Sequence, residues 1–102
     1  MLTKLLVKNS RNLTLQEINN SIAAIFSDCY RSHIMVYGFY YDPDNGIYAF
    51  APRDELEKLS TKGIKEFDVE NYFIETNTCV WLVHWENPKN PEIRLYVPPQ
   101  QK

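Results

Sequence analysis

Residues 33–51 read HIMVYGFYYDPDNGIYAFA, and this stretch decides the fold. Two runs rich in β-branched and aromatic residues, 33–41 and 46–51, flank the polar loop DPDNG at 42–46. Runs of this composition predict β-strands. The proline presets the backbone of a turn and the glycine supplies a left-handed position, so the loop predicts a β-hairpin.

The loop also sets the register of the hairpin. With residues 42–46 as the loop, Tyr40 faces Tyr48. Two positions further from the loop, Gly38 faces Phe50 and leaves room beside that ring. Because side chains alternate along a strand, each face carries its own set of residues. One face carries His33, Met35, Tyr37, Phe39, Tyr41, Ile47 and Ala49, and the other carries Ile34, Val36, Tyr40, Tyr48 and Phe50.

Neither face of this hairpin is polar, whereas a hairpin with one wet side alternates apolar and polar residues. Two explanations remain open. Either residues 64–76 or a C-terminal hairpin cover the second face, or that face binds a partner. Aromatic side chains suit partner binding because they offer a large contact area with few rotatable bonds. The candidate partner-binding residues of the hairpin are Tyr37, Phe39, Tyr40, Tyr48 and Phe50.

A strand and a helix precede the hairpin. Residues 2–8 form an apolar run with interspersed lysines, which predicts a first strand. Thr14 is followed three residues later by Glu17, which is the spacing of a capping box at a helix start. From Leu15 to Cys29 apolar residues recur at steps of three and four, which predicts an amphipathic helix.

The chain after the hairpin predicts a short helix and a closing hairpin. Pro52 begins the helix and Gly63 ends it, with acidic residues in the first turn. Residues 64–76 fit either an irregular strand or a short helix capped by the aspartate of this segment. Residues 79–85 and 93–97 have the composition of two strands, and the turn between them contains two prolines.

The resulting order is βαββα followed by a β-hairpin, which predicts a single α+β domain spanning residues 1–102. We expect a mostly antiparallel sheet with one long and one short helix, both packed on one face. The leading βαββα order is compatible with a ferredoxin-like arrangement.

The first 62 residues resemble an RNA-recognition-motif domain in layout. LLVKN at 5–9 looks like the first-strand motif of that family, and YAF at 48–50 looks like the aromatic centre of its third-strand motif. The family has an aromatic residue where this chain has Leu6, and a basic residue followed by glycine where it has Gly46 and Ile47. These departures remove one stacking ring and one basic contact to phosphate. The resemblance implies a related fold, with single-stranded RNA or DNA binding as an alternative function.

The charge of the chain is unevenly distributed. The formal net charge of −2 argues against a protein that binds by gripping phosphate backbones. Residues 42–92 hold 11 acidic residues against five basic ones. Such a segment is either an ordinary solvated face or a patch that docks on a basic partner, such as a nucleic-acid-handling protein. The candidate residues of this patch are Asp54, Glu55, Glu66, Asp68 and Glu70.

The sequence offers little for catalysis or metal binding. His33 and His84 are the two histidines, and in strand alternation His84 points away from the flanking tryptophans. The paired Cys or His spacings of a zinc site do not occur, so we expect no metal and no cofactor. Cys29 and Cys79 fit buried thiols of a reducing compartment, with a disulfide between them left open. No signal peptide or membrane span is predicted, which favours the cytoplasm.

Together these features predict a small non-catalytic binding module of the inhibitor or adaptor type, acting through the aromatic hairpin and the acidic segment. We expect a protein partner, with direct nucleic-acid binding and membrane binding disfavoured and a homodimer also compatible. The richness in Asn, Lys, Ile, Tyr and Phe is typical of AT-rich coding sequence, which favours a phage or plasmid accessory protein, such as an immunity or anti-defence protein. The alternatives are a single-stranded RNA- or DNA-binding domain and a small hydrolase using histidine.

Overall fold

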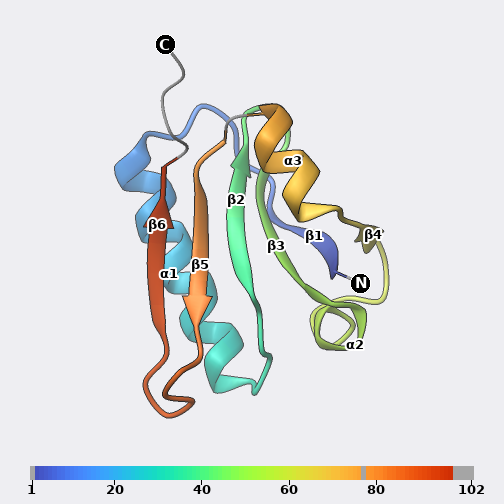
Figure 1. Cartoon of the computed structure of the whole chain (residues 1–102), viewed down its shortest axis with the longest axis vertical. Helices are drawn as coiled ribbons and strands as arrows, with labels where there is room; N and C mark the ends of the chain where they lie inside the picture. The colour runs from blue at the N-terminus through green and yellow to red at the C-terminus, as the bar shows by residue number, and fades with distance from the viewer. Residues whose placement is uncertain (1, 77, 98–102) are drawn as a thin grey trace.

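The computed structural model describes residues 2–76 and 78–97, apart from the side chain of Ile74. Six strands form one antiparallel sheet, accompanied by three helices (Figure 1). The strands are β1 (Leu2–Lys8), β2 (Gly38–Asp42), β3 (Gly46–Pro52), β4 (Lys65–Glu66), β5 (Val80–His84) and β6 (Glu92–Tyr96). Their order across the sheet is β4-β1-β3-β2-β5-β6. The expected α+β class, antiparallel sheet and closing hairpin are confirmed.

Helix α1 (Leu15–Arg31) lies along one face of the sheet, behind it in Figure 1. The predicted capping box is present at its start. The N–H of Glu17 donates to the Thr14 hydroxyl at 3.2 Å, and the N–H of Thr14 donates to the Glu17 carboxylate at 3.0 Å. These two bonds satisfy amides that a helix start otherwise leaves unpaired, so a local sequence pattern sets where α1 begins.

The main hydrophobic core lies between α1 and the sheet. Two tryptophans of this core satisfy their ring N–H groups there. Trp81 donates to the Asn19 side chain at 2.7 Å, and Trp85 donates to the carbonyl of Val36 at 3.0 Å. The buried residues of the core are Leu5, Ile18, Ile22, Cys29, Ile34, Val36, Phe39, Ile47, Ala49, Ala51, Leu56, Trp81 and Val83.

The hairpin of β2 and β3 has the predicted register, and its loop is confined to residues 43–45 because Asp42 and Gly46 pair with each other. Tyr40 pairs with Tyr48, and Gly38 pairs with Phe50. A Cβ atom at Gly38 would collide with the Phe50 ring and would lie 2.6 Å from the carbonyl oxygen of Trp81. The glycine therefore leaves the space that the Phe50 ring occupies, as the sequence indicates.

The strand before the loop begins at Gly38 and not at the predicted His33. The N–H of Tyr37 donates to the carbonyl of Phe50 at 2.9 Å, although Phe50 is also the register partner of Gly38. Two residues of one strand thus oppose one residue of its neighbour, which is a β-bulge.

The bulge reverses the faces predicted for the residues before it. Ile34 and Val36 are buried in the α1-side core, whereas alternation placed them beside Tyr40. Tyr37 lines the opposite side of the sheet, whereas alternation placed it beside Phe39. These face assignments were wrong because the two-residue period does not continue through a bulge.

Two short helices complete the fold. Helix α2 (Arg53–Leu56) begins after Pro52 as predicted, but it ends at Leu56 and not at Gly63. Helix α3 (Val69–Thr76) confirms the helical alternative for residues 64–76. The Asp68 carboxylate accepts a hydrogen bond from the Asn71 side chain at 2.6 Å at the start of α3.

The helices lie on both faces of the sheet, since α3 crosses in front of it in Figure 1 and α1 lies behind. The two predicted helices, α1 and α2, share one face as expected, since Leu56 of α2 is buried in the same core as the residues of α1, and it is α3 that covers the opposite face. None of the helices in residues 2–76 and 78–97 has the length and apolar character needed to cross a bilayer. Cys29 and Cys79 are free thiols.

Candidate functional site

Helix α3 covers part of the second sheet face. In Figure 1 it lies in front of β3 and β1 and beside β2, while the same side of β5 and β6 carries none of the described helices. Val69, Tyr72 and Phe73 of α3 pack against this face, together with the preceding Phe67. The explanation that residues 64–76 cover the second face is therefore confirmed for the β2–β3 portion.

The covered portion is an aromatic cluster, which we define as Tyr40, Tyr48, Phe67 and Tyr72. The Tyr40 ring stacks on Tyr48 with centroids 5.1 Å apart and on Phe67 with centroids 5.2 Å apart. The Tyr72 ring of α3 closes over it at 4.8 Å. Tyr40 has no exposed surface, so the centre of this cluster belongs to the interior of the protein.

A lysine of the chain itself occupies the cation site of the aromatic cluster. The Lys4 ammonium nitrogen lies 5.1 Å from the ring centroid of Tyr48, 5.3 Å from that of Phe67 and 5.6 Å from that of Tyr72. Such distances are favourable for a cation over aromatic rings. Partial burial lowers the pKa of Lys4, and the charge of Lys65 lowers it further, while Asp42 acts in the opposite direction.

The hydroxyl of Tyr40 is the polar exception in this cluster. It is buried and has no hydrogen-bond partner among the described residues. Burial raises the pKa of Tyr40 well above its usual value, so the hydroxyl stays protonated at all physiological pH values. A buried hydroxyl without a partner costs stability, since water would otherwise solvate it.

An open apolar cleft lies beside the aromatic cluster, and we call it the α3-side cleft. Its volume is about 630 Å³, which lies within the range of ligand-binding clefts. Met35 and Tyr37, at its edge, remain 45% and 43% exposed. The lining residues are Leu2, Met35, Tyr37, Phe50, Val69, Glu70, Phe73, Val80, Leu82, Val83, His84 and Trp85. The cleft thus offers a large apolar surface with few polar groups.

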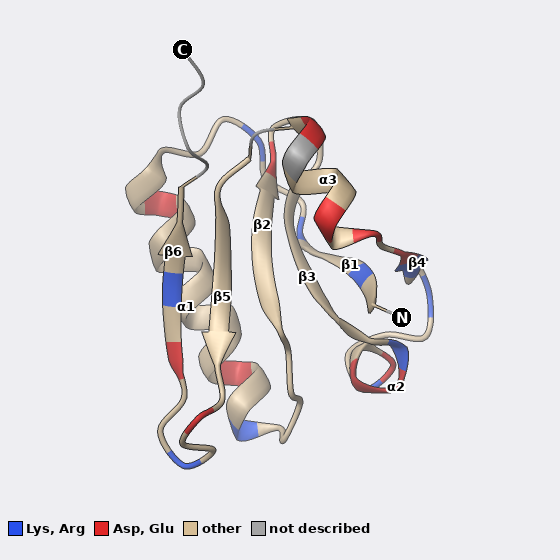
Figure 2. Ribbon diagram, in the orientation of Figure 1, with Lys and Arg blue, Asp and Glu red and all other residues tan. Residues whose placement is uncertain are grey.

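An acidic pocket of about 520 Å³ adjoins this cleft. Glu66, Asp68 and Glu70 line it, and none of them forms an ion pair with the residues that the structure describes. It shares Leu2, Val69 and Glu70 with the α3-side cleft, so the two hollows lie next to each other. Figure 2 shows acidic residues on α3, on the chain leading into it and on α2.

The structure brings some of the predicted hairpin residues into this region. Tyr37 and Phe50 line the α3-side cleft, while Tyr40 and Tyr48 belong to the aromatic cluster. Phe39 lies in the α1-side core and is fully buried, so it offers no contact surface to a partner. Since α3 covers Tyr40 and Phe50, these rings also have no free face on which a nucleotide base could stack.

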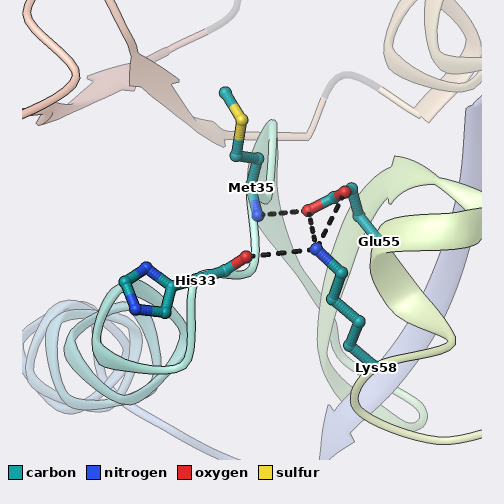
Figure 3. Close-up of polar contacts among 4 residues, drawn as sticks. All are labelled: His33, Met35, Glu55 and Lys58. Carbon is teal, nitrogen blue, oxygen red and sulfur yellow. Dashed lines mark hydrogen bonds and ion pairs between the residues drawn. The ribbon is translucent and has the colours of Figure 1, made fainter.

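The predicted acidic residues divide into two groups. Glu66, Asp68 and Glu70 line the acidic pocket, whereas Asp54 and Glu55 belong to α2. The Glu55 carboxylate is engaged within the fold, as Figure 3 shows.

Glu55 fixes the connection between α1 and the bulge. Its carboxylate accepts the N–H of Met35 at 2.7 Å and pairs with Lys58 at 3.1 Å (Figure 3). The same lysine donates to the carbonyl of His33 at 3.2 Å. The backbone hydrogen bond from Met35 is the main cause of the lowered pKa of Glu55, and Lys58 adds to it. This carboxylate therefore positions one wall of the α3-side cleft.

Several residues of the cleft were not among the candidates. Val80, Leu82 and His84 line it together, and these alternate positions fall on one face of a strand. Their common face was therefore detectable in the sequence. Phe73 and Met35 were not detectable, because their positions depend on the docking of α3 and on the bulge.

The groups that could carry chemistry lie apart from one another. His84 is hydrogen-bonded to the Tyr96 hydroxyl at 2.9 Å, and His33 is exposed at the end of α1. Burial raises the pKa of the Cys29 thiol to about 11, so it is protonated at neutral pH and is a poor nucleophile. In residues 2–76 and 78–97, no group of three His, Cys, Asp or Glu side chains converges as a metal site would require.

No protein-family model, curated protein sequence or solved structure matches this chain. The geometry and charge of the α3-side cleft are therefore the basis for a functional proposal.

Proposed function

We propose that the protein is a non-catalytic binding module that takes a segment of a protein partner into the α3-side cleft. The segment carries large apolar side chains for the cleft and, next to them, a lysine or arginine for the acidic pocket. The observation that carries this proposal is that an apolar and an acidic hollow lie next to each other and share Leu2, Val69 and Glu70 as lining residues.

The apolar part supplies the affinity. Tyr37 and Met35 at the edge are about half exposed, and both residue types are frequent at protein contacts. A tyrosine that is buried by the partner on one side and keeps its hydroxyl at the rim is a typical energetic centre of an interface.

The acidic part supplies selectivity. Three carboxylates without ion pairs in the described region attract a basic segment and repel an acidic one. A basic nucleic-acid-handling protein, in the role of a target for inhibition, has this chemistry. The proposed partner class thus combines an apolar anchor with positive charge.

A peptide library displayed on phage provides the first test. We expect selection on the immobilised protein to enrich sequences with a large apolar residue followed within a few positions by Lys or Arg. Calorimetry with a selected peptide then measures the variants. Tyr37→Ser is expected to weaken binding about tenfold or more, which corresponds to roughly 1.4 kcal/mol. Glu70→Gln is expected to weaken it less and to reduce its dependence on salt.

The control is Leu15→Ser, which removes an exposed apolar side chain from the start of α1, outside the cleft. It should leave both affinity and thermal midpoint unchanged. Selected peptides that bind Tyr37→Ser as tightly as the parent protein, or a selection without any enriched sequence, would contradict the proposal.

We also infer that the first four strands have a ferredoxin-like arrangement. Support comes from β3, which lies between β1 and β2 while α1 connects these two strands, as in a split βαβ unit. Helix α2, with four residues, is shorter than such an arrangement usually contains. We further infer that the protein resides in a reducing compartment such as the cytoplasm. The free thiols Cys29 and Cys79 fit a reducing compartment.

A further inference from the structure

Strand β6 forms one edge of the sheet, on the opposite edge from β4. Among the described residues it pairs with β5 alone, so its outer edge presents backbone groups to solvent. Such an edge is a template for another strand, and monomeric proteins usually protect it.

The backbone groups that point outward can be identified. The N–H of Val83 donates to a carbonyl just before β2 at 2.9 Å, so Val83 directs its backbone groups toward β2. Because these groups alternate in direction along a strand, Leu82 directs its own toward β6, where its partner is Arg94. Arg94 therefore points inward, and its neighbours Ile93 and Leu95 direct their N–H and C=O groups out of the sheet.

The side chains of this edge offer little protection. Leu95 is 37% exposed and Val97, directly after the strand, is 66% exposed. The two charged residues of β6 neutralise each other, since the Arg94 guanidinium lies 3.0 Å from the Glu92 carboxylate. β6 contains neither lysine nor proline, the residues that most often block edge pairing.

We propose that a second copy of this chain pairs with β6 in antiparallel register about a two-fold axis at Leu95. Leu95 then faces Leu95 of the second copy, and Ile93 faces its Val97. Every outward-pointing residue of the edge acquires a backbone partner, and each such pair exchanges two hydrogen bonds. The apolar side chains of the edge meet one another, and the sheet continues across both copies as an isologous dimer.

The neighbouring registers are less favourable. An axis at Arg94 sets two guanidinium groups directly opposite each other, and like charges in that position are destabilising. An axis at Ile93 sets Leu95 opposite Pro91, which has no N–H to donate. The axis at Leu95 instead sets Arg94 opposite Tyr96 of the second copy, where a cation can lie over an aromatic ring.

Sedimentation equilibrium over a range of concentrations tests the dimer, with amide hydrogen exchange to locate it. We expect a mass rising toward twice 12.1 kDa, and exchange at Ile93 and Leu95 that slows as the dimer forms. A single-chain mass at every concentration would overturn the proposal. A dimer in which the Leu95 amide exchanges as fast as in the monomer would also overturn it, because the contact would then lie elsewhere.

Substitutions of Leu95, the residue on the proposed two-fold axis, provide a second test of the dimer. Leu95→Lys sets two positive charges opposite each other and is expected to give a folded monomer, whereas Leu59→Lys, with a side chain 40% exposed after α2, is expected to remain dimeric. Mixing the Leu95→Lys chain with a Leu95→Glu chain is expected to restore the dimer, because opposite charges then meet at the axis. A mixture that stays monomeric contradicts the register, and the exchange data on the parent protein decide the matter even if one variant fails to fold.

Discussion

The two faces of one sheet contrast in how they are covered. On one face, α1 runs for 17 residues and buries a continuous apolar core. On the other, α3 has eight residues and covers the aromatic cluster, with the α3-side cleft open beside it. The same hairpin supplies apolar side chains to both faces. The residue types of the hairpin therefore do not distinguish its buried face from its partly open face. The length of the helix that covers each face makes that difference.

The largest expected effect is on stability, and it is seen by removing one aromatic ring from each face of the sheet. Phe39→Ala empties a fully buried position beneath α1 and should cost about 3–5 kcal/mol of unfolding free energy. Tyr37→Ala, at the edge of the cleft, should cost less than about 1 kcal/mol. Urea denaturation of both variants measures the difference. Equal losses would show that the cleft is as much a part of the core as the α1 side.

A smaller loss of stability is expected on substitution of Gly38, which packs against the Phe50 ring. A Cβ at Gly38 would collide with the Phe50 ring on the cleft side and with the backbone carbonyl of Trp81, so Gly38→Ala should cost roughly 1–3 kcal/mol. Phe50→Leu removes the ring, so it should cost less in the Gly38→Ala background than in the parent protein. Thermal unfolding of the four proteins of this cycle measures the coupling. Strictly additive losses would show that the ring does not sense the added methyl group.

The smallest effect at neutral pH concerns the buried hydroxyl of Tyr40. Tyr40→Phe removes a polar group that has no partner in the described region, so stability should stay the same or rise by about 1 kcal/mol. Burial raises the pKa of Tyr40 in the folded state, whereas in the unfolded chain it ionises near pH 10. The parent protein should therefore lose stability as the pH rises above about 10, and Tyr40→Phe should lose less.

Denaturant titrations between neutral and alkaline pH measure this difference. Tyr37→Phe is the control, because its ring is half exposed in the cleft. Parallel pH profiles for the parent protein and Tyr40→Phe would show that water reaches the Tyr40 hydroxyl.

Much of the fold could be predicted where the signal is local. Thr14 and Glu17 satisfy each other's amides within one turn, so the start of α1 needs no distant partner. The tight turn at residues 43–45 sets the pairing of Tyr40 with Tyr48 through backbone geometry alone. Strand alternation likewise holds along β5, where Trp81 and Val83 are buried in the α1-side core and Val80 and Leu82 pack on the opposite side.

The candidate site was only partly predictable. Tyr37, Phe50 and Glu70 were candidates and line the cleft, but Tyr37 lies on the face opposite to the one that alternation gives it. At the bulge that turns it, Tyr37 bonds to Phe50 of the neighbouring strand, and the nearby Met35 amide bonds to Glu55, which is 20 residues away in sequence. Periodicity carries no information about such a distant contact.

By itself the sequence determined the elements and the register of the hairpin, because capping, turn geometry and alternation act over a few residues. Only the tertiary structure decided which apolar side chains are core and which are surface. Phe39, Tyr40 and Tyr37 are aromatic residues at neighbouring positions. Yet Phe39 lies under α1, Tyr40 lies under α3 and Tyr37 lies at the edge of an open cleft. The reason is that burial depends on what packs against a side chain, and the packing partners here come from distant parts of the chain.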